Sequence, residues 1–448
     1  MTLNQDNIVA VATATGYAGI GVVRISGHNL LEIAAQLSHK NNLKPRLASY
    51  TDFYNIDNEV IDSGLIIYFS APYSFTGEDV IELQGHGSPI VLQMILKRCL
   101  ELGCRIAQPG EFSRRAYLNG KIDLLQAESI VDLIHAESEM AARGALKSLK
   151  GTFSKHIDTI NQQLINLRMF VEATLDFPEE DIEFIVEAKI QDKLRLLQTS
   201  IGGLLANTKQ GVLLNNGANI VIVGRPNVGK SSLLNALANE EVAIVTAFAG
   251  TTRDIVKEKI IINGVVFNLI DTAGIRDTED IVEKIGIERA LHAVQNAELC
   301  LVLIDDSIGI TPEDELILAK IPTELPRLFV HNKIDITNSN PRIDSNSGVS
   351  NIYISAKQQL GLGLLRDEIL KLVGFDNSCN NVFIARTRHL EAMKQAVSHI
   401  DNAFANWHQL ELIAEELRYA HNNLTDITGE FTSDDLLGEI FSKFCIGK

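Results

Sequence analysis

Residues 220–231 read IVIVGRPNVGKS, and this stretch decides the fold of the segment around it. The β-branched run at its start is typical of a buried parallel strand. The remainder fits the pattern G-x-x-x-x-G-K-S in full, and residues 232–239 are predicted to continue as a helix. In this order, glycines let backbone N–H groups close around phosphates at a helix N-terminus, Lys230 neutralises phosphate charge, and the Ser231 hydroxyl can ligate Mg²⁺. We therefore predict a phosphate-binding loop.

Two further motifs lie close downstream. Residues 257–262 and 265–270 are predicted to form a hairpin, because the Asn263-Gly264 pair between them is a favoured two-residue turn. The hairpin runs into the sequence DTAG at 271–274, the D-x-x-G pattern, whose aspartate is expected to hold Mg²⁺ through water and whose glycine N–H is expected to contact a γ-phosphate. Residues 249–254 read AGTTRD, and a threonine here can complete Mg²⁺ coordination and order a switch loop.

The base-recognition motifs complete the set. Predicted strands at 299–304 and 327–330 precede Asn332-Lys333-Ile334-Asp335, which fits N-K-x-D, and a strand at 352–354 precedes Ser355-Ala356-Lys357. The aspartate of N-K-x-D accepts two N–H bonds from guanine, whereas adenine would leave this carboxylate unsatisfied. Four motifs in order, each after a strand, predict a GTP-binding domain with an alternating α/β fold.

The usual hydrolytic residues of Ras-like proteins are missing. The position after D-x-x-G, which holds a water-orienting glutamine in Ras-like proteins, is Ile275 here. An arginine finger in cis is not evident either. Another group must therefore supply charge and position the attacking water.

Composition bounds the remaining possibilities. The 448 residues are 46% hydrophobic and 22% charged, which is typical of a globular chain of about three domains. The formal net charge of −17 excludes a basic surface footprint over the whole protein, so nucleic acid would need a local patch or a partner. Five scattered cysteines favour a reducing compartment. The apolar runs are too short to span a bilayer and the N-terminus lacks a secretory pattern, so we expect a cytoplasmic protein without membrane contact.

The pattern along the chain predicts several domains. Residues 1–120 have the alternation of a mixed α/β domain, with strands at 8–12, 22–26, 64–69 and 79–83, a glycine turn at 16–21 and a helix at 89–102. Helical spacing dominates residues 121–216 and returns at 375–448, where helices are expected over 387–422 and 433–444. The fold class is thus multidomain α/β and all-α: an N-terminal α/β domain, a split helical domain and a GTPase domain inserted at 217–374.

Motifs outside the GTPase segment make a family resemblance specific. Residues 75–87 read FTGEDVIELQGHG, residues 109–113 read PGEFS, residues 429–437 lie in the last helical region, and the chain ends in FCIGK. Together with GRPNVGKS, AGTTRD and DTAGIR, these motifs resemble the TrmE/MnmE family of tRNA wobble-uridine modification GTPases over essentially the whole chain. The resemblance implies a Ras-like P-loop GTPase domain and a tetrahydrofolate-binding-like N-terminal domain, residues 1–120, that mediates dimerisation.

The same resemblance implies how hydrolysis is catalysed. K⁺ takes the place of an arginine finger, held by Asn227 of the P-loop and by Thr246, Phe248 and Thr251 of the loop around the ion; Ser231 and Thr252 ligate Mg²⁺. Glu283 is the catalytic residue that positions water; without the resemblance it would be interpreted as part of a solvated helix face. The residues expected to bind GTP are Asn227, Val228, Gly229, Lys230, Ser231, Ser232, Thr246, Ala247, Phe248, Ala249, Gly250, Thr251, Thr252, Asp271, Thr272, Ala273, Gly274, Asn332, Lys333, Asp335, Ser355, Ala356 and Lys357.

A second ligand site is implied in the N-terminal domain. Arg24, Glu82 and Lys121 match positions that bind a tetrahydrofolate derivative of the 5-formyl or 5,10-methylene type, and Lys448 joins them because the family's C-terminal tail reaches this site. A carboxylate can pair the donor edge of a pterin and cations suit a glutamate tail. The resemblance places Cys445 near this pocket, where a catalytic role and a small buried thiol are both open interpretations.

The family resemblance also implies the reaction and the partners. The implied reaction adds an aminomethyl or carboxymethylaminomethyl group to carbon 5 of the wobble uridine of certain tRNAs. The implied assembly is a homodimer that joins an FAD-dependent partner protein in a heterotetramer. Gly16, Gly19 and Gly21 have the wrong order for a dinucleotide fingerprint, so FAD binding is assigned to the partner. The alternatives are a ribosome-assembly GTPase, which the acidic charge balance disfavours, and a free-standing folate aminomethyltransferase, which leaves the GTPase motifs unexplained.

Overall fold

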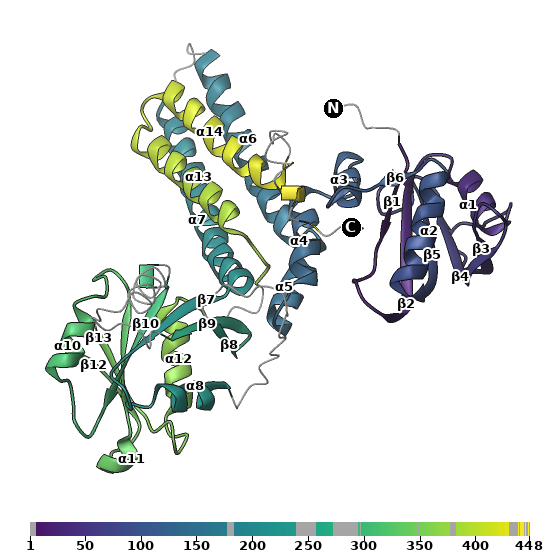
Figure 1. The fold of residues 1–448 in the computed structure, drawn as a ribbon. Coiled ribbons are helices and arrows are strands. Elements are labelled where there is room, and N and C mark those ends of the chain that lie inside the picture. Colours follow the sequence, from purple (N-terminus) through teal and green to yellow (C-terminus); the bar gives the residue numbers. More distant parts are fainter. Residues whose placement is uncertain are drawn as a thin grey trace. The chain divides into compact units, whose positions relative to one another are not determined.

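The computed structural model describes residues 6–176, 183–238, 257–271, 294–295, 297–346, 349–376 and 382–429, together with 438, 440–442, 444 and 447. The chain forms two compact units (Figure 1). The first comprises Met1–Val131, Leu149–Asp176 and Ala414–Lys448; the second comprises Asp132–Ser148 and Phe177–Ile413. Each unit contains one β-sheet with its own hydrophobic core.

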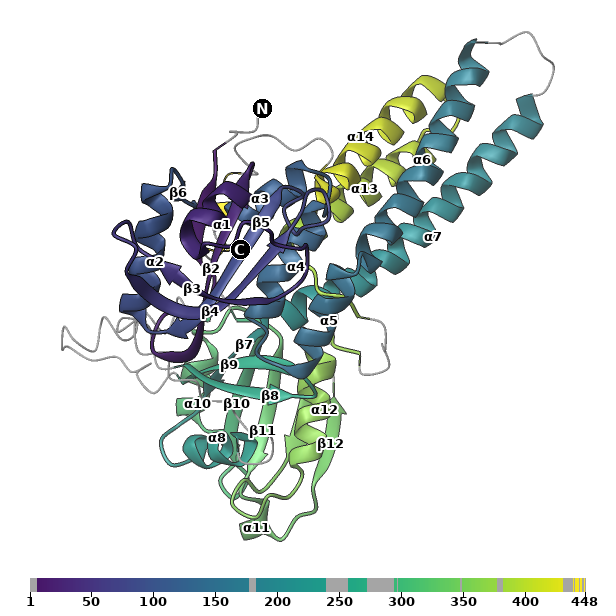
Figure 2. The ribbon, with the colours of Figure 1, turned by 90° about the vertical axis from the view of Figure 1, so that its right-hand side faces the viewer.

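The first unit is built on a six-stranded sheet of order β3-β4-β5-β2-β1-β6 (Figures 1 and 2). Its neighbouring strands are antiparallel except β1 and β6, which are parallel. Helices α1 and α2 pack their apolar sides against one face of the sheet. The bounds are β1 (Ile8–Val11), β2 (Ala18–Gly27), α1 (Leu30–Ser38), β3 (Ser49–Tyr54), β4 (Val60–Phe69), β5 (Asp79–Gly87), α2 (Pro89–Glu101) and β6 (Arg105–Ile106).

The predicted strands and the predicted helix of this region are confirmed, with two differences. Strand β3 was not predicted, because its sequence SYTDFY mixes polar and aromatic residues and carries a weak apolar alternation. The glycine turn predicted over 16–21 is wrong in its second half, since Ala18–Gly27 is a strand. The pairing of β2 with β5 shifts register between Ala18 and Gly21, and glycines tolerate such a bulge inside a strand.

Helices account for most of the described residues between and after the two sheet regions. They are α3 (Glu111–Leu118), α4 (Leu124–Ile134), α5 (Glu139–Leu149), α6 (Thr152–Asp176), α7 (Glu183–Asn216), α13 (Thr387–Ala405) and α14 (Leu410–Thr428). The helical pattern predicted over 387–422 is confirmed as two helices, α13 and α14, with a turn at 406–409 between them, and most of the segment 433–444 lies outside the described residues. Within the second unit, α13 packs along α7, where the Thr208 hydroxyl lies 3.2 Å from the Met393 sulfur (Figure 1).

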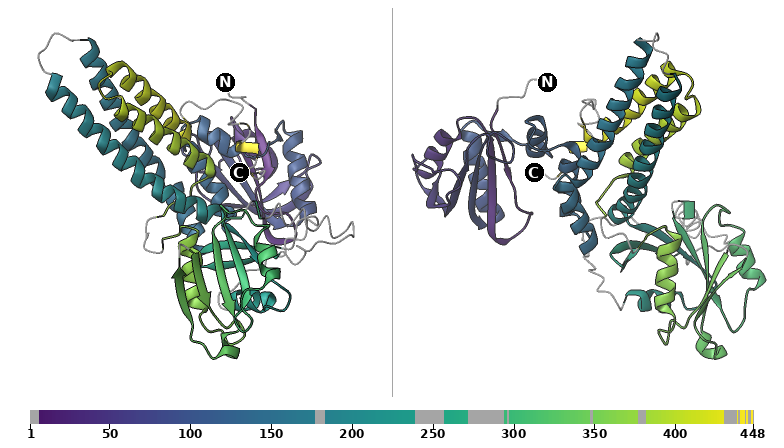
Figure 3. Two further views of the ribbon diagram at one scale, coloured as in Figure 1. Left: turned by 90° about the vertical axis from the view of Figure 1, so that its left-hand side faces the viewer. Right: turned by 180° about the vertical axis from the view of Figure 1, so that it is seen from behind.

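The second unit contains a seven-stranded sheet of order β12-β13-β11-β10-β7-β9-β8. The five central strands are parallel, and β8 and β12 pair antiparallel at the two edges. The twist of the sheet and the helix α12 beside it are visible in Figure 3. The bounds are β7 (Ala218–Val223), α8 (Lys230–Ala238), β8 (Lys257–Ile262), β9 (Val265–Asp271), β10 (Leu299–Asp305), α10 (Pro312–Leu318), β11 (Arg327–Asn332), α11 (Ile334–Thr337), β12 (Arg342–Asn346), β13 (Val349–Tyr353) and α12 (Leu362–Leu372).

Both faces of this sheet are buried, which is why its strands are almost continuously apolar. Alternate residues of β7 and β10 point to opposite faces: Ile220 and Leu301 pack in the cluster that contains α8 and α12, whereas Val221 and Val302 pack with α10. Helix α5 also belongs to the first of these clusters through its small residues. The predicted hairpin is confirmed as β8 and β9.

Among the described residues, no helix is long and apolar enough to cross a membrane.

Candidate nucleotide-binding site

The phosphate-binding loop connects β7 to α8, as the motif predicts. Gly224 has φ 150° and a side chain there would meet the Leu303 carbonyl oxygen at 2.6 Å; Gly229 has φ 101° and a side chain there would meet the Asn332 amide nitrogen at 2.3 Å. Only glycine suits these two places, both by backbone conformation and by space. The Lys230 ammonium donates to the Gly224 carbonyl oxygen at 2.7 Å. The loop is thus closed on itself by its own lysine.

The three loops that would surround a guanine nucleotide are held together by one side chain, Asn332. Its amide nitrogen donates to the Val228 carbonyl oxygen at 2.8 Å, and its amide oxygen accepts from the Ala356 N–H at 3.0 Å. Asn332 as a whole residue is 3% exposed. Asn332 therefore joins the phosphate loop, the N-K-x-D segment and the Ser355-Ala356-Lys357 loop in a water-excluded place.

The Asp335 carboxylate, which is predicted to accept from guanine, is oriented as well. The Ser355 hydroxyl, which is fully buried, donates to Asp335 Oδ1 at 2.6 Å. This bond holds one carboxylate oxygen in place, and because the carboxylate is planar and rigid, the position of the other oxygen is restricted too. Asp335 itself is half-buried, so a base lying beside it can still reach the carboxylate.

Two ion pairs near the loops involve aspartates that no sequence motif contains. Lys333 Nζ lies 2.6 Å from Asp305 Oδ2 at the end of β10, and Arg225 Nε of the phosphate loop lies 3.1 Å from Asp314 Oδ2 of α10. Asp314 also accepts from the backbone and hydroxyl of Thr311, which caps α10. Little in the sequence indicates these ion pairs, because both aspartates lie in a segment without a motif. Only the order of strands in the sheet shows that β10 adjoins β11.

The structure brings together most of the predicted nucleotide residues that it describes. The phosphate loop follows β7 and Ser355 follows β13, whereas Asp271 and Asn332 are the last residues of β9 and β11. The carboxyl ends of these four parallel strands meet at one edge of the sheet. Ligands of open α/β sheets bind at this edge. Ser231, Ser232 and Lys357 are exposed. Outside the described residues lie Thr246, Ala247, Phe248, Ala249, Gly250, Thr251, Thr252, Thr272, Ala273, Gly274 and Glu283.

The predicted folate residues are only partly brought together. Arg24 on β2 pairs with Glu82 on β5, with Nη2 2.9 Å and Nε 3.0 Å from the same carboxylate oxygen. Arg24 Nη1 also donates to the Gly447 carbonyl oxygen of the C-terminal tail at 3.1 Å. Lys121 instead donates to the Pro72 carbonyl oxygen at 2.9 Å. Lys448 and Cys445 lie outside the described residues.

A buried charge network supports this edge of the first unit. The Arg115 guanidinium, 4% exposed, donates to the carboxylates of Glu78 at 3.0 Å, Asp6 at 2.9 Å and Glu111 at 3.1 Å. Burial raises the pKa of the Glu111 carboxyl, but hydrogen bonds from Arg105, the Gln108 backbone and Arg115 outweigh burial and leave the pKa below its usual value. The network anchors α3 to the loop before β5; Glu78 and Glu111 lie in the motifs at 75–87 and 109–113, but their pairing with Arg115 was not predicted.

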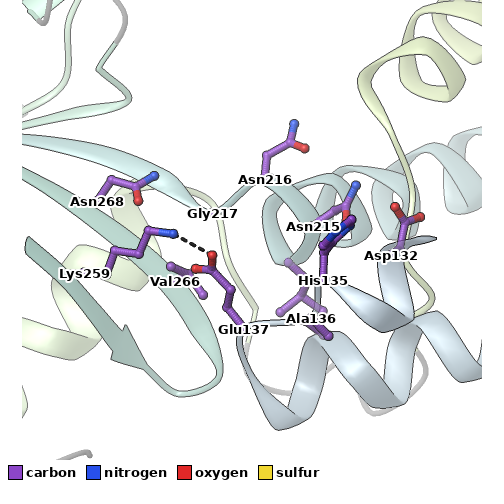
Figure 4. Close-up of a pocket in the computed structure, with 12 residues that line it drawn as sticks. Asp132, His135, Ala136, Glu137, Asn215, Asn216, Gly217, Lys259, Val266 and Asn268 are labelled. Carbon is purple, nitrogen blue, oxygen red and sulfur yellow. Dashed lines mark hydrogen bonds and ion pairs between the residues drawn. The ribbon is translucent and has the colours of Figure 1, made fainter. Parts of the chain in front are cut away.

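A separate cavity of about 240 Å³ lies at the other end of β7, beside the segment that precedes this strand (Figure 4). Its lining is mostly polar, and Lys259 Nζ of β8 lies 2.5 Å from Glu137 Oε1 on one side of it. Because the cavity adjoins Gly217 at the amino end of β7, it is distinct from the nucleotide edge of the sheet. Figure 4 shows Asn215 and His135 on the opposite side from the Lys259–Glu137 pair.

A parallel sheet whose phosphate loop is joined to the N-K-x-D segment by a buried side chain is typical of the class of P-loop GTPases. Two family models match the chain: "GTP-binding protein TrmE N-terminus" over residues 7–121 and "MnmE helical domain" over residues 124–445. The chain is 53% identical to the tRNA modification GTPase MnmE of Chromobacterium violaceum and 53% identical to that of Neisseria meningitidis serogroup C, covering 100% of both sequences in each comparison. The chain belongs to the MnmE family.

Solved structures add little to this assignment. A crystal structure of Era from Aquifex aeolicus bound to GDP and AlF4⁻ is 28% identical over 41% of this chain and 66% of that one, with a TM-score of 0.28. The FeoB G-domain of Methanococcus jannaschii is 25% identical over 35% of this chain and 97% of that one, with a TM-score of 0.26. The family membership rests on the full-length relatives. With it, the predicted fold class is confirmed: an N-terminal α/β region, a split helical region and an inserted GTPase fold.

Proposed function

We propose that this protein hydrolyses GTP as part of the modification of the wobble uridine of certain tRNAs. GTP binding is supported by the Asn332 side chain, which joins the phosphate loop to both loops predicted to contact guanine. The tRNA half is supported by full-length identity to relatives named tRNA modification GTPase MnmE.

The chemistry of GTP binding follows from the groups at the sheet edge. Lys230 is at the start of α8, where its charge adds to the helix N-terminus in holding phosphates. The exposed Ser231 hydroxyl, in the first turn of α8, is available as a Mg²⁺ ligand, with Thr252 as the second. Asp335 accepts from the guanine N–H groups, so ATP is rejected. Mg²⁺, when bound, neutralises charge on the β- and γ-phosphates.

Hydrolysis is proposed to use K⁺ and Glu283. Asn227 lies in the phosphate loop in the left-handed backbone region, φ 63°, with an exposed side chain that an ion beside the phosphates can reach. Thr246, Phe248 and Thr251 are the proposed loop ligands of the ion. A monovalent cation there stabilises the negative charge that develops in the transition state. Glu283 is proposed to position the attacking water, because Ile275 has no group that can do so.

The N-terminal domain is proposed to bind a reduced folate of the 5-formyl or 5,10-methylene type, which supplies the one-carbon unit. The residues present fit such a ligand. Arg24 and Glu82 form a pair whose side chains are 20% and 18% exposed, so cation and carboxylate are both ordered and accessible. Glu82 suits the donor edge of a pterin, and Arg24, Lys121 and Lys448 suit its carboxylates.

The assembly is proposed to be a cytoplasmic homodimer that works with an FAD-dependent partner protein in a heterotetramer. Dimerisation is assigned to residues 1–120, the helical domain to 121–216 with 375–448, and the GTPase domain to 217–374. The acidic net charge of −17 supports a role for the partner in binding tRNA, since phosphates are attracted by basic surface.

The test is to measure modified nucleosides by mass spectrometry in tRNA from cells with and without the gene. Loss of aminomethyl-type wobble uridines on deletion, restored by the intact gene but not by Asp271→Ala, supports the proposal. Arg24→Gln should fail to restore them while keeping GTP turnover. The matched variant Arg46→Gln, which removes an exposed arginine that donates to the Tyr73 carbonyl, should restore them. An unchanged tRNA profile on deletion contradicts the proposal and favours ribosome assembly.

A further inference from the structure

The segment between β10 and α10 carries a buried carboxylate that belongs to none of the nucleotide motifs. Asp305 is the last residue of β10 and is 6% exposed. Strand β10 pairs with β11 in parallel register, with Asp305 opposite Asn332. The backbone N–H of Asp306 donates to the Asn332 carbonyl oxygen at 2.9 Å. The aspartate therefore ends its strand directly beside the guanine-recognition segment.

Both oxygens of this carboxylate have defined partners. Oδ1 accepts from the Ser307 hydroxyl at 2.6 Å and from the Ser307 N–H at 3.1 Å. Oδ2 accepts from Lys333 Nζ at 2.6 Å. Ser307 thus fixes the orientation of the carboxylate, and the carboxylate in turn fixes the ammonium. Burial raises the pKa of Asp305, but the bonds from Lys333 and Ser307 outweigh burial and hold the pKa below its usual value.

Lys333 is held at both ends by this arrangement. Its backbone has φ 70°, in the left-handed region, and it lies between Asn332, which bridges the loops, and Asp335, which is oriented by Ser355. Its side chain is 29% exposed. A free lysine side chain loses roughly 2 kcal/mol of rotamer entropy when it is ordered. A lysine that is already ordered avoids this loss when a nucleotide binds.

We propose that Asp305 is a positioning residue for guanine-nucleotide binding, which acts by holding the Lys333 side chain in its binding conformation before the nucleotide arrives. The inference rests on the GTP-binding function proposed above and extends it to a residue outside the motifs. Asp305 contributes to affinity for GDP and GTP alike, because neither the base nor its loop differs between the two nucleotides. It contributes nothing to the hydrolytic step, whose groups lie at the phosphates.

The first experiment measures nucleotide affinity and steady-state hydrolysis in the full-length protein with Asp305→Asn. The expected result is a rise of about 10-fold in Kd for fluorescent GDP and in KM for GTP, with kcat within 2-fold of wild type, because a charge-assisted bond becomes a neutral one. The matched control is Asp306→Asn, which changes the same charge one residue away and touches the Thr337 hydroxyl instead of Lys333. This control should bind within 2-fold of wild type.

A double-mutant cycle tests whether Asp305 acts through Lys333. In a Lys333→Ala background, adding Asp305→Asn should change the Kd for GDP by less than 2-fold, because the partner is already gone. A further 10-fold loss in that background would show that Asp305 acts by another route and would overturn the proposal. Equal effects of Asp305→Asn and Asp306→Asn would overturn it as well.

A second variant tests the proposal if Asp305→Asn does not fold. Ser307→Ala removes the hydroxyl that orients the carboxylate and keeps the charge, and it should raise the Kd for GDP by about 3-fold without altering kcat. Wild-type affinity in Ser307→Ala, with or without a folded Asp305→Asn, overturns the proposal. Failure of the wild-type protein to bind GDP or GTP would instead remove the proposed GTPase function itself, so the two failures are distinguishable.

Discussion

Replacing Asn332 tests whether the nucleotide site is assembled by a single side chain. In Asn332→Ala two hydrogen bonds of 2.8 and 3.0 Å are lost, and the Val228 carbonyl and Ala356 N–H, in residues 2% and 4% exposed, are left without these partners. A typical net contribution is about 1 kcal/mol per bond, and a stranded buried group costs about 1–3 kcal/mol. The free energy that holds the loops in place for the nucleotide should therefore fall by roughly 3 kcal/mol, which corresponds to about a 100-fold loss of affinity for GDP.

Asn332→Asp is a stricter version of the same test, because it keeps the shape of the side chain and changes only its hydrogen-bonding groups. One carboxylate oxygen can still accept from the Ala356 N–H, but the other replaces the donor that faces the Val228 carbonyl, so two oxygens meet at about 2.8 Å. We expect affinity at least as low as in Asn332→Ala. The control is Asn340→Asp, an exposed asparagine with the same charge change.

The assay is stopped-flow binding of a fluorescent GDP to the full-length protein, with association and dissociation measured separately. Because the phosphate and guanine loops would no longer be held together, most of the loss should fall on the dissociation rate. The reasoning is refuted if Asn332→Ala and Asn332→Asp bind GDP within 3-fold of wild type while Asn340→Asp does the same.

Four further predictions cover hydrolysis, folding and chemical reactivity. Glu283→Ala should keep GTP binding and lose most hydrolysis in a single-turnover assay, and full turnover would remove its proposed role. Gly264→Ala should lower the free energy of unfolding by about 1–2 kcal/mol in urea titrations, because Gly264 has φ 81° in the hairpin turn, whereas Gly202→Ala in the open surface of α7 should raise it by about 0.5–1 kcal/mol. Cys300 should resist thiol reagents in the native protein and react after unfolding, since burial raises its pKa to about 12; rapid labelling at pH 8 would contradict this. The pKa of Glu111 is lowered by folding, so its stabilising effect should be complete above the ordinary value of 4.5 and lost as the pH falls below it; Glu111→Gln should flatten this dependence in urea titrations between pH 3 and 7.

Most of the GTPase fold follows from local sequence. The β-branched run of β7, the motif glycines and the Asn263-Gly264 turn each impose a backbone conformation on their own residues, so strand, loop and hairpin could be predicted without a structure. The same reasoning missed β3 and did not locate the turn that divides α13 from α14. There the apolar periodicity is weak or runs on across a turn, and packing decides where the element ends.

The nucleotide site divides in the same way. Sequence order alone predicted which residues bind phosphate and guanine, because each motif must follow a parallel strand whose carboxyl end lies at the shared edge. Only the tertiary structure decided which other residues support them. Asp305 and Asp314 reach Lys333 and Arg225 because β10 lies between β7 and β11, and neighbour order in a sheet depends on long-range pairing that no local pattern encodes.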